Sequence, residues 1–414
     1  MKIVRAYKYR IYPSKEQEAS LQAGLCECKD LWNSLLQYSK EYHKETGKFP
    51  SRYALIKLTK GKRTKLYSQS AQNIADRLHK AINGAILRKR KGMKAGFPRF
   101  KPIERIKSIT YPQSGFRLED TLHLSKTGKI QIRKHREING SIKTLTIKRM
   151  PSGKWYALFS VEVEMAPRTQ SGKPSVGIDL GIEHFAYLSN GDSIKNPRHL
   201  RSVEKKLRQV KRRLSRKKKG SRNRTKAKVK VASVHEKVAN CRRDFLHKSS
   251  KMLADSYSLI AMEDLETQRM SRSFLAKSIL DCAWAEFARM LRYKAEEAGC
   301  EVVLVNPAWT TQECSQCGSV KKKTLAERWH SCACGASMHR DLNAAINILR
   351  RSCNESCKRR KRSFLRATAG TVECQARGEE TSAHYRTNGI SVFNEAGSPA
   401  AFSNGVIHMF SYII

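Results

Sequence analysis

The sequence predicts a multidomain α+β protein, and three observations support this fold class. The chain has 414 residues, which suggests two to four domains at the usual size of about 100–200 residues each. Residues 14–89 carry apolar side chains at helical spacing, whereas residues 108–164 form short segments rich in strand formers. From residue 175 to about residue 351, strand-like and helix-like segments are mixed.

The first hundred residues are expected to form one strand followed by a helical module. Residues 2–11 are rich in strand formers, and Pro13 ends that strand. Ser14 and Gln17 make an S-x-x-Q capping box, which predicts the start of a helix. A second helix is predicted from about Gln69 to Lys89. The apolar face of the first helix comprises Leu21, Leu25, Cys28, Trp32 and Leu35.

A small β-barrel or sheet is expected next. Glycine and proline within residues 91–101 end the second helix. The predicted strands are Ser108–Tyr111, Lys129–Arg133, Leu145–Arg149 and Trp155–Glu164, and the N-terminal strand could complete them. Residues 168–174 have the composition of a linker.

Strands and helices share the following segment. The predicted strands are Ser175–Asp179, His184–Leu188, Ser258–Met262 and Cys300–Val305, and helices are predicted over residues 283–298 and 340–351. Two cationic segments with a thin apolar seam predict an antiparallel helical hairpin at about residues 200–250. Residues 353–414 lose this periodicity, so we expect a mobile tail or one ordered by RNA.

The charge of the chain is an argument about its partners. It has 82 Lys and Arg against 36 Asp and Glu, a net charge of +46. Sixteen of the thirty residues from 201 to 230 are Lys or Arg. An ordinary enzyme that acts on small metabolites does not need such a strong positive electric field. Nucleic acid is therefore the expected partner. Anionic lipid is a weaker alternative, and the hairpin could also be a merely solvated charged surface.

From the sequence we expect neither a membrane span nor a signal peptide. No stretch approaches the roughly 18 apolar residues of a membrane span. Met1–Arg5 has no apolar segment of a signal peptide. We therefore expect a cytoplasmic protein that does not contact membrane.

Three acidic residues occupy the ends of predicted elements in this basic chain. Asp179 ends one strand, Glu263 ends another, and Asp341 opens a helix. Carboxylates at one sheet edge can hold two Mg²⁺ ions, which suit phosphodiester cleavage. Each acid alone could instead cap a helix or pair with a local arginine. Asp264 and Asp281 are the rival candidates.

Four of the twelve cysteines fall within 21 positions. Cys314 and Cys317 form a C-x-x-C pair, and Cys332 and Cys334 form a C-x-C pair. Such pairs on two tight turns predict one structural Zn²⁺ ion. Because the second pair is one residue short, His330 or His339 could replace a cysteine. Cys353 and Cys357 could be further ligands, although free thiols are the simpler interpretation.

The motifs together resemble those of the TnpB family, compact RNA-guided nucleases of transposons that are related to type V CRISPR effectors. The resemblance is carried by GIDLGIEHFAYLSNG, IAMEDL, NPAWTTQECSQCG and HRDLNAAINIL, and also by YKYRIYPSKEQE, GFPRFK and YPQSGF near the start. It covers roughly residues 1–350. The family usually has C-x-x-C in the second cysteine pair, and often an acidic residue where Met338 and His339 stand.

The resemblance implies a fold in which each segment has a role. It assigns residues 1–12 and 98–172 to a wedge-type β-barrel and 13–97 to a helical recognition module. Residues 173–305 and 336–352 become a RuvC-like nuclease of RNase H fold, interrupted by a zinc ribbon at 306–335. Residues 353–414 remain a mobile tail.

The resemblance also implies the activity and the site residues. Asp179, Glu263 and Asp341 match the RuvC acids, and the four clustered cysteines match the zinc ligands. The implied activity is Mg²⁺-dependent cleavage of double-stranded DNA beside a short flanking motif, directed by a guide RNA from the transposon end. No protein oligomer is required. The candidates for nucleic-acid contact are Arg99, Lys101, Lys211, Arg212, Arg213, Arg216, Lys217 and Lys218.

Two other functions remain open from the sequence. A nuclease-inactive, RNA-guided DNA-binding regulator would need no intact acids, and this chain keeps all three. A compact type V CRISPR effector would share every motif. A DNA-strand transposase is disfavoured because no lone Tyr lies in a His-x-His context.

Overall fold

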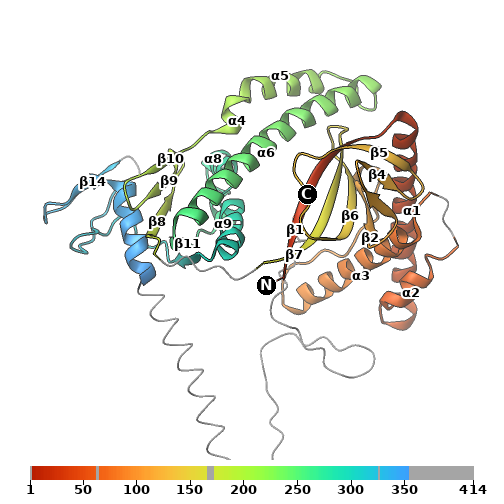
Figure 1. The fold of residues 1–414 in the computed structure, drawn as a ribbon, viewed down its shortest axis with the longest axis horizontal. Coiled ribbons are helices and arrows are strands. Elements are labelled where there is room, and N and C mark those ends of the chain that lie inside the picture. Colours follow the sequence, from red (N-terminus) through yellow and green to blue (C-terminus); the bar gives the residue numbers. More distant parts are fainter. Residues whose placement is uncertain (1, 62–64, 166–171, 325–326, 354–414) are drawn as a thin grey trace, which may run out of the picture. The chain divides into compact units, whose positions relative to one another are not determined.

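The structure is a computed structural model that describes residues 2–61, 65–165, 172–324 and 327–353. Within these residues the chain forms two compact units, residues 2–165 and residues 172–353 (Figure 1). The predicted tail lies outside the described residues, apart from Cys353. Among the described helices, none combines the length and apolarity that a membrane span requires. The predicted α+β fold class is confirmed.

In the first unit, three helices pack beside a strongly curved sheet. They are α1 (Lys15–Thr46), α2 (Arg52–Lys57) and α3 (Ser68–Arg90), with a short 3₁₀ turn at Ile103–Arg105. The predicted capping box starts α1, because the Ser14 hydroxyl accepts from the Gln17 N–H at 3.2 Å and the Gln17 side chain accepts from the Ser14 N–H at 3.0 Å. The five predicted apolar residues of α1 are all buried.

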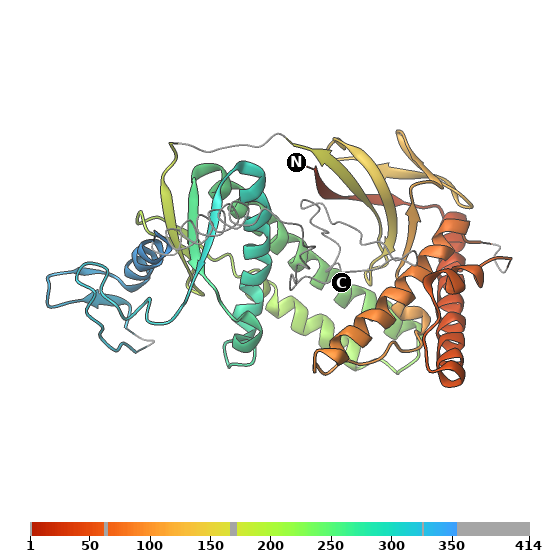
Figure 2. The same cartoon turned by 90° about the horizontal axis from the view of Figure 1, so that it is seen from below.

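Seven antiparallel strands make the sheet of this unit, in the order β2-β6-β7-β1-β5-β4-β3. It curls into a nearly closed barrel (Figures 1 and 2). The N-terminal strand lies in its centre, paired with β7 and β5. The strands are β1 (Lys2–Tyr12), β2 (Ser108–Pro112), β3 (Phe116–Leu118), β4 (Thr121–Leu124), β5 (Gly128–Arg133), β6 (Ser141–Arg149) and β7 (Trp155–Glu164).

The second unit is built on a five-stranded sheet with the order β10-β9-β8-β11-β12. The first three strands are antiparallel, and β11 runs parallel to both β8 and β12. This is the strand order expected of an RNase H fold. The strands are β8 (Ser175–Leu180), β9 (His184–Leu188), β10 (Ser193–Lys195), β11 (Leu259–Glu263) and β12 (Glu301–Val305).

The two faces of this sheet carry different helices. Alternate residues such as Ile178 and Met262 face a core with α6 (Arg222–Ser256) and α9 (Trp284–Ala298). In that core, the ring of Phe185 makes edge contacts with Phe245 and Phe287 at centroid distances of 4.9 and 5.0 Å. Residues 340–353 form a helix on the opposite face, where Ile348 packs against Ala261 and Val303. Figures 1 and 2 show the sheet between these two layers.

The predicted helical hairpin is formed by α5 (Glu204–Ser215) and α6, and α4 (His199–Ser202) precedes it. Leu207 is buried in the seam. Arg224 closes the turn, because its guanidinium donates to the carbonyl groups of Leu214 and Lys217 at 3.1 and 2.8 Å. Two short helices, α7 (Thr267–Met270) and α8 (Ala276–Cys282), follow β11. They were not predicted.

Candidate functional site

Asp179 and Glu263 meet because β8 and β11 are parallel neighbours. The register pairs Ile178 with Met262, so Asp179 and Glu263 are the next residues on the two strands. Residues at the same level of parallel strands point to the same face of a sheet. That face is the one covered by the helix at residues 340–353.

Asp341 reaches this edge on the covering helix. The helix can approach β8 closely because Gly177 has no side chain: a Cβ there would lie 2.1 Å from the carbonyl oxygen of Ala345 and 2.9 Å from the Cβ of Leu349. Asp341 lies four residues, about one helical turn, before Ala345. Gly177 in turn lies two residues before Asp179, on the same face of the strand. The packing thus places the third acid near the first.

The electrostatics of Asp179 show that the three carboxyl groups interact. Burial, followed by the charges of Glu263 and Asp341, raises the pKa of Asp179 well above its usual value, and Arg340 opposes this shift. Burial also raises the pKa of Glu263, against a hydrogen bond from Thr310 and the charge of Arg351. Buried like charges of this kind would be offset by a divalent cation, so the donor set fits Mg²⁺.

The three acids are not a compact ligand set by themselves. In the described part of the chain, the four-cysteine cluster is the one group of three or more His, Cys, Asp or Glu side chains whose ligand atoms all lie within 4.8 Å of one another. The carboxylates therefore interact through their charges across a wider space than the thiols do.

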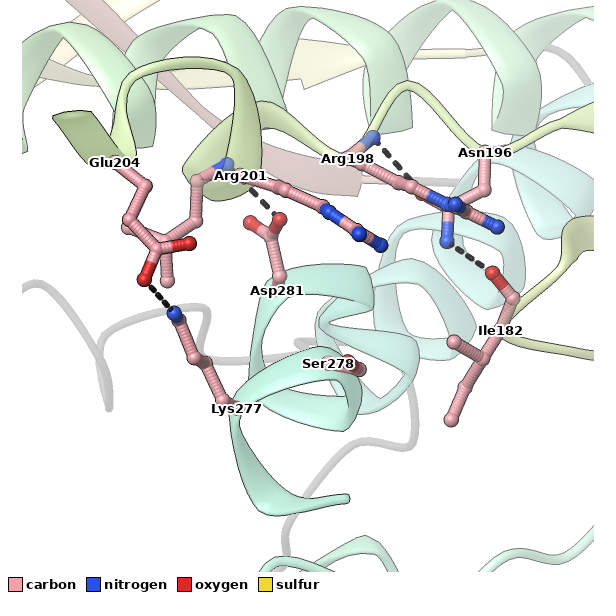
Figure 3. A pocket seen from close by; sticks show the side chains of 9 residues that line it. Ile182, Asn196, Arg198, Arg201, Glu204, Lys277, Ser278 and Asp281 are labelled. Carbon is pink, nitrogen blue, oxygen red and sulfur yellow. Dashed lines mark hydrogen bonds and ion pairs between the residues drawn. The ribbon is translucent and has the colours of Figure 1, made fainter.

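The two rival acids have other surroundings. Asp264 is exposed, and its N–H bonds to the carbonyl of Val305 at 2.9 Å. Asp281 pairs with Arg242 at 2.7 Å and accepts the N–H of Leu200 at 2.9 Å. It thereby ties α8 to α6 and α4, in the wall of a cavity of about 350 Å³ (Figure 3). Asp281 therefore has a structural partner and lies outside the acidic group.

The four predicted cysteines come together. The sulfurs of Cys314 and Cys334 lie 3.7 Å apart, and those of Cys317 and Cys332 lie 3.5 Å apart. Each pair is followed by a glycine at positive φ, 78° at Gly318 and 90° at Gly335, which allows the tight turns. The short strands β13 (Trp329–Ser331) and β14 (Ser337–His339) flank the second pair. Four thiols at these distances can hold a metal ion such as zinc.

Neither histidine replaces a cysteine in this cluster. His330 is buried and its Nδ1 contacts the amine of Lys323. His339 stacks on Tyr187 at 5.1 Å, and its Nδ1 lies 4.0 Å from a carboxylate oxygen of Asp341. The four sulfurs therefore form one cluster even though the second cysteine pair is one residue shorter than C-x-x-C. Cys353 is exposed outside the cluster, and Cys357 lies outside the described residues.

The predicted nucleic-acid contacts fall into two groups. The six residues of the hairpin, Lys211, Arg212, Arg213, Arg216, Lys217 and Lys218, are all exposed. Arg99 is also exposed, on the loop after α3. Lys101 differs, because its amine lies 3.1 Å from the centre of the Trp32 ring and burial lowers its pKa to about 8. Its contact with Trp32 makes Lys101 the weakest candidate of the eight.

Sequence reasoning missed two residues of the site. Gly177 is the first residue of the motif GIDLGIEHFAYLSNG, but only the structure shows that a helix backbone contacts it. Thr310 is 1% exposed, and its hydroxyl donates to Oε1 of Glu263 at 2.5 Å. No spacing rule identifies a single threonine in a loop, so the sequence held no signal for this contact.

An RNase H-type sheet with acids at one edge, followed by a four-cysteine ribbon, defines a protein of the RuvC-like class. Three family profiles match the chain. The OrfB_IS605 profile, described as "Probable transposase", matches residues 158–273. The Cas12f1-like TNB domain matches residues 284–348. A helix-turn-helix domain of OrfB_IS605 matches residues 1–48, which in this structure form a strand and one long helix.

Curated relatives resemble most of the chain. InsQ of Escherichia coli (strain K12) is 31% identical over 378 residues, which cover 84% of this chain and 92% of InsQ. A protein of Streptomyces pristinaespiralis is 33% identical over 365 residues, covering 84% of this chain and 89% of the relative. The names of both contain the words RNA-guided DNA endonuclease. The chain belongs to the TnpB family, whose OrfB_IS605 profile it matches.

A solved structure supports the fold. The Cas12f1 chain in a complex with sgRNA and target DNA aligns with a TM-score of 0.56 at 14% identity, covering 84% of this chain and 98% of that one. At this identity the likeness concerns the fold alone.

Proposed function

We propose that this protein is an RNA-guided DNA endonuclease that hydrolyses phosphodiester bonds at Asp179, Glu263 and Asp341. The observation that carries the proposal is the convergence of these three acids at one sheet edge in a chain of net charge +46. Members of the family at 31% and 33% identity bear that activity in their names. A transposon-encoded nuclease of a prokaryotic cytoplasm is the matching biological setting.

Mg²⁺ ions bound by the three acids would supply the charge that activates a water and stabilises the leaving oxygen. The protein contributes the position and ionisation of the acids. Thr310 donates to Glu263, and the charges of Arg340 and Arg351 favour the ionised carboxylates. The cysteine cluster, filled by one Zn²⁺ ion, would have a structural role, because four thiolates leave no open position.

Guide RNA and target DNA are the proposed partners. The exposed cations of α5 and the following turn would contact phosphates, while base pairing with the guide would read the target. The Cas12f1 chain with a similar fold was solved with sgRNA and target DNA.

Cleavage by matched variants tests the proposal. Asp179→Asn keeps the size of the side chain and removes its charge, and should abolish Mg²⁺-dependent cleavage of target DNA by the purified protein–RNA complex. Binding of RNA and of target DNA should persist. Asp264→Asn is the matched control, because Asp264 is exposed one residue beyond Glu263, and should cut like the wild type.

Two outcomes would contradict the proposal. Undiminished cutting by Asp179→Asn would show that the reaction takes place elsewhere. A wild-type complex that binds target DNA but never cuts it would favour the nuclease-inactive regulator. The presence of all three acids argues against that alternative. A CRISPR effector would carry a guide RNA from a repeat array instead of from a transposon end. Sequencing the RNA that co-purifies with the protein, when both are expressed from the native locus, distinguishes these two sources.

A further inference from the structure

The loop between β12 and the cysteine cluster contributes a hydroxyl group that hydrogen-bonds to the candidate catalytic carboxylate of Glu263. Thr310 is 1% exposed and donates to Glu263 Oε1 at 2.5 Å. The Pro307 carbonyl lies farther from the same hydroxyl, at 3.1 Å. A hydroxyl has a single proton, so the shorter contact to the carboxylate takes it. In the described part of the chain, Oε2 of Glu263 has no hydrogen-bond donor.

The backbone around Thr310 is held by side-chain hydrogen bonds from the helix at residues 340–353. Asn347, on the helix that carries Asp341, donates to the Thr310 carbonyl at 3.0 Å. Arg351 from the same helix donates to the Asn306 and Ala308 carbonyls at 3.1 and 2.6 Å. Trp309 has a φ of 67°, an unusual conformation for a bulky residue. Strain of this kind persists only where the surroundings enforce it.

The same loop is tied to the cysteine cluster. Glu313 directly precedes Cys314, and its carbonyl accepts from both Asn343 and Asn347 at 2.7 Å. Its carboxylate pairs with Arg351 at 2.6 Å and also contacts Arg350. One helix therefore fixes the third acid, the loop that holds Glu263, and the first cysteine.

We propose that Thr310 is a positioning residue that fixes the rotamer of Glu263, so that Oε1 is occupied and Oε2 is presented to a divalent cation. This inference rests on the proposed function for the role of Glu263. The hydroxyl acts through the carboxylate and touches neither metal nor substrate. Groups that orient metal ligands typically change metal affinity or activity by about 10–100-fold when they are removed.

Three substitutions separate the hydroxyl from the packing of the side chain. Thr310→Val keeps the volume and removes the donor, whereas Thr310→Ser keeps the donor. Thr311→Val is the matched control, because the neighbouring hydroxyl makes no hydrogen bond in the described structure. Thr310→Ala provides a second donor-free variant in case Thr310→Val does not fold. Retained binding of guide RNA and target DNA identifies the folded variants.

Binding of Mn²⁺ by the zinc-loaded protein–RNA complex, followed by electron paramagnetic resonance, is the first measurement. Thr310→Val should weaken Mn²⁺ affinity about 10-fold or more, while Thr310→Ser and Thr311→Val stay within about twofold of wild type. Asp179→Asn should abolish the same Mn²⁺ signal and so assign it to the acids. Cleavage as a function of Mg²⁺ concentration should show Thr310→Val needing more Mg²⁺ for its half-maximal rate.

The outcomes separate this inference from the proposed function. Two outcomes would overturn the positioning role and leave the proposed nuclease function unaffected. One is wild-type Mn²⁺ affinity in both donor-free variants, and the other is an equal loss of affinity in Thr310→Ser and Thr310→Val. Mn²⁺ binding that depends on Thr310, in a wild-type complex that does not cut, would support the positioning role and overturn the nuclease. Absence of any Mn²⁺ signal that depends on Asp179 would overturn both.

Discussion

At the scale of single residues, the missing side chain of Gly177 allows Asp341 to lie near Asp179. Helix 340–353 lies against β8 with the Ala345 carbonyl in the space that a side chain would need. The contact is between two backbones, so no rotamer change can relieve it. The glycine is thus required for close approach, even though its φ is not in the left-handed region.

Gly177→Ala should lower the free energy of unfolding by roughly 1–3 kcal/mol, the usual range for overpacking, and should reduce DNA cleavage because Asp341 is displaced. Urea unfolding and cleavage assays measure the two effects. Gly84→Ala is the control: its Cβ would meet no atom closer than 3.5 Å on helix α3, so it should be neutral or stabilising by up to about 1 kcal/mol. A Gly177→Ala protein with wild-type stability and activity would contradict the packing argument.

Lys294 is a second residue whose environment predicts a measurable effect. It extends from α9 to α6, where its amine donates to the His247 carbonyl and to the Ser250 hydroxyl. Burial, aided by the charge of Lys251, lowers the pKa of Lys294 to about 8 from 10.5. Because the unfolded chain binds the proton more tightly, protonated Lys294 opposes folding below pH 8. This cost is relieved as the pH rises from about 8 towards 10.5.

Lys294→Met should therefore flatten the rise in unfolding free energy between pH 7.5 and pH 10. The difference between wild type and variant should change by about 1 kcal/mol over this range, a reduced value because the amine is half-exposed. Lys248→Met, an exposed lysine on α6, is the control. Urea unfolding at the two pH values gives the result, and parallel pH profiles for wild type and Lys294→Met would refute it.

At the scale of elements, the cysteine ribbon is the feature most open to direct test. Purified protein should contain one zinc ion per chain, measured by atomic emission. Replacing Cys314 and Cys334 with Ser should remove that ion, because the four sulfurs form one cluster. Cys241→Ser is the control, since this exposed cysteine lies on α6 outside the cluster. Full zinc content in the double variant would show that the metal is bound elsewhere.

The elements also show what the sequence could and could not predict. The start of α1 was predictable from its two-residue capping box. Strand β7 and the apolar seam of the hairpin were predictable because each repeats apolar residues at a regular spacing. Strands β3 and β4 have only three and four residues, and α7 has four. Elements this short contain too few residues to show a periodic pattern. Strands β3 and β4 form by pairing with each other and with β5.

The three acids could be predicted from the sequence, whereas the contact between the loop and Glu263 could not. Asp179, Glu263 and Asp341 could be proposed from their positions at the ends of apolar segments. The hydrogen bond from Thr310 depends on a loop held by Asn347, a residue 37 positions away. Neither propensity nor spacing encodes a tertiary contact of that separation.

At the scale of the whole molecule, the net charge of +46 predicts strong dependence of RNA binding on salt. Replacing Lys211, Arg212 and Arg213 with Gln should weaken RNA binding and reduce the slope of log affinity against log salt by about 2, at about 0.7 per phosphate contact. The control is Lys248→Gln with Lys251→Gln, because these lysines already pair with Asp244 and Asp255. Equal slopes for the two multiple variants would exclude the hairpin from RNA contact.

The position of helix 340–353 also has a consequence for the time at which activity can appear. Synthesis proceeds from the N-terminus, so Asp179 and Glu263 leave the ribosome well before Asp341. The last acid docks only after the cysteine ribbon has been made, since the ribbon lies between Glu263 and Asp341 in the chain. In a nascent chain that ends before residue 341, the proposed site would therefore lack one of its three carboxylates. Any DNA cleavage by the proposed site would then begin only after both compact units described here have been synthesised.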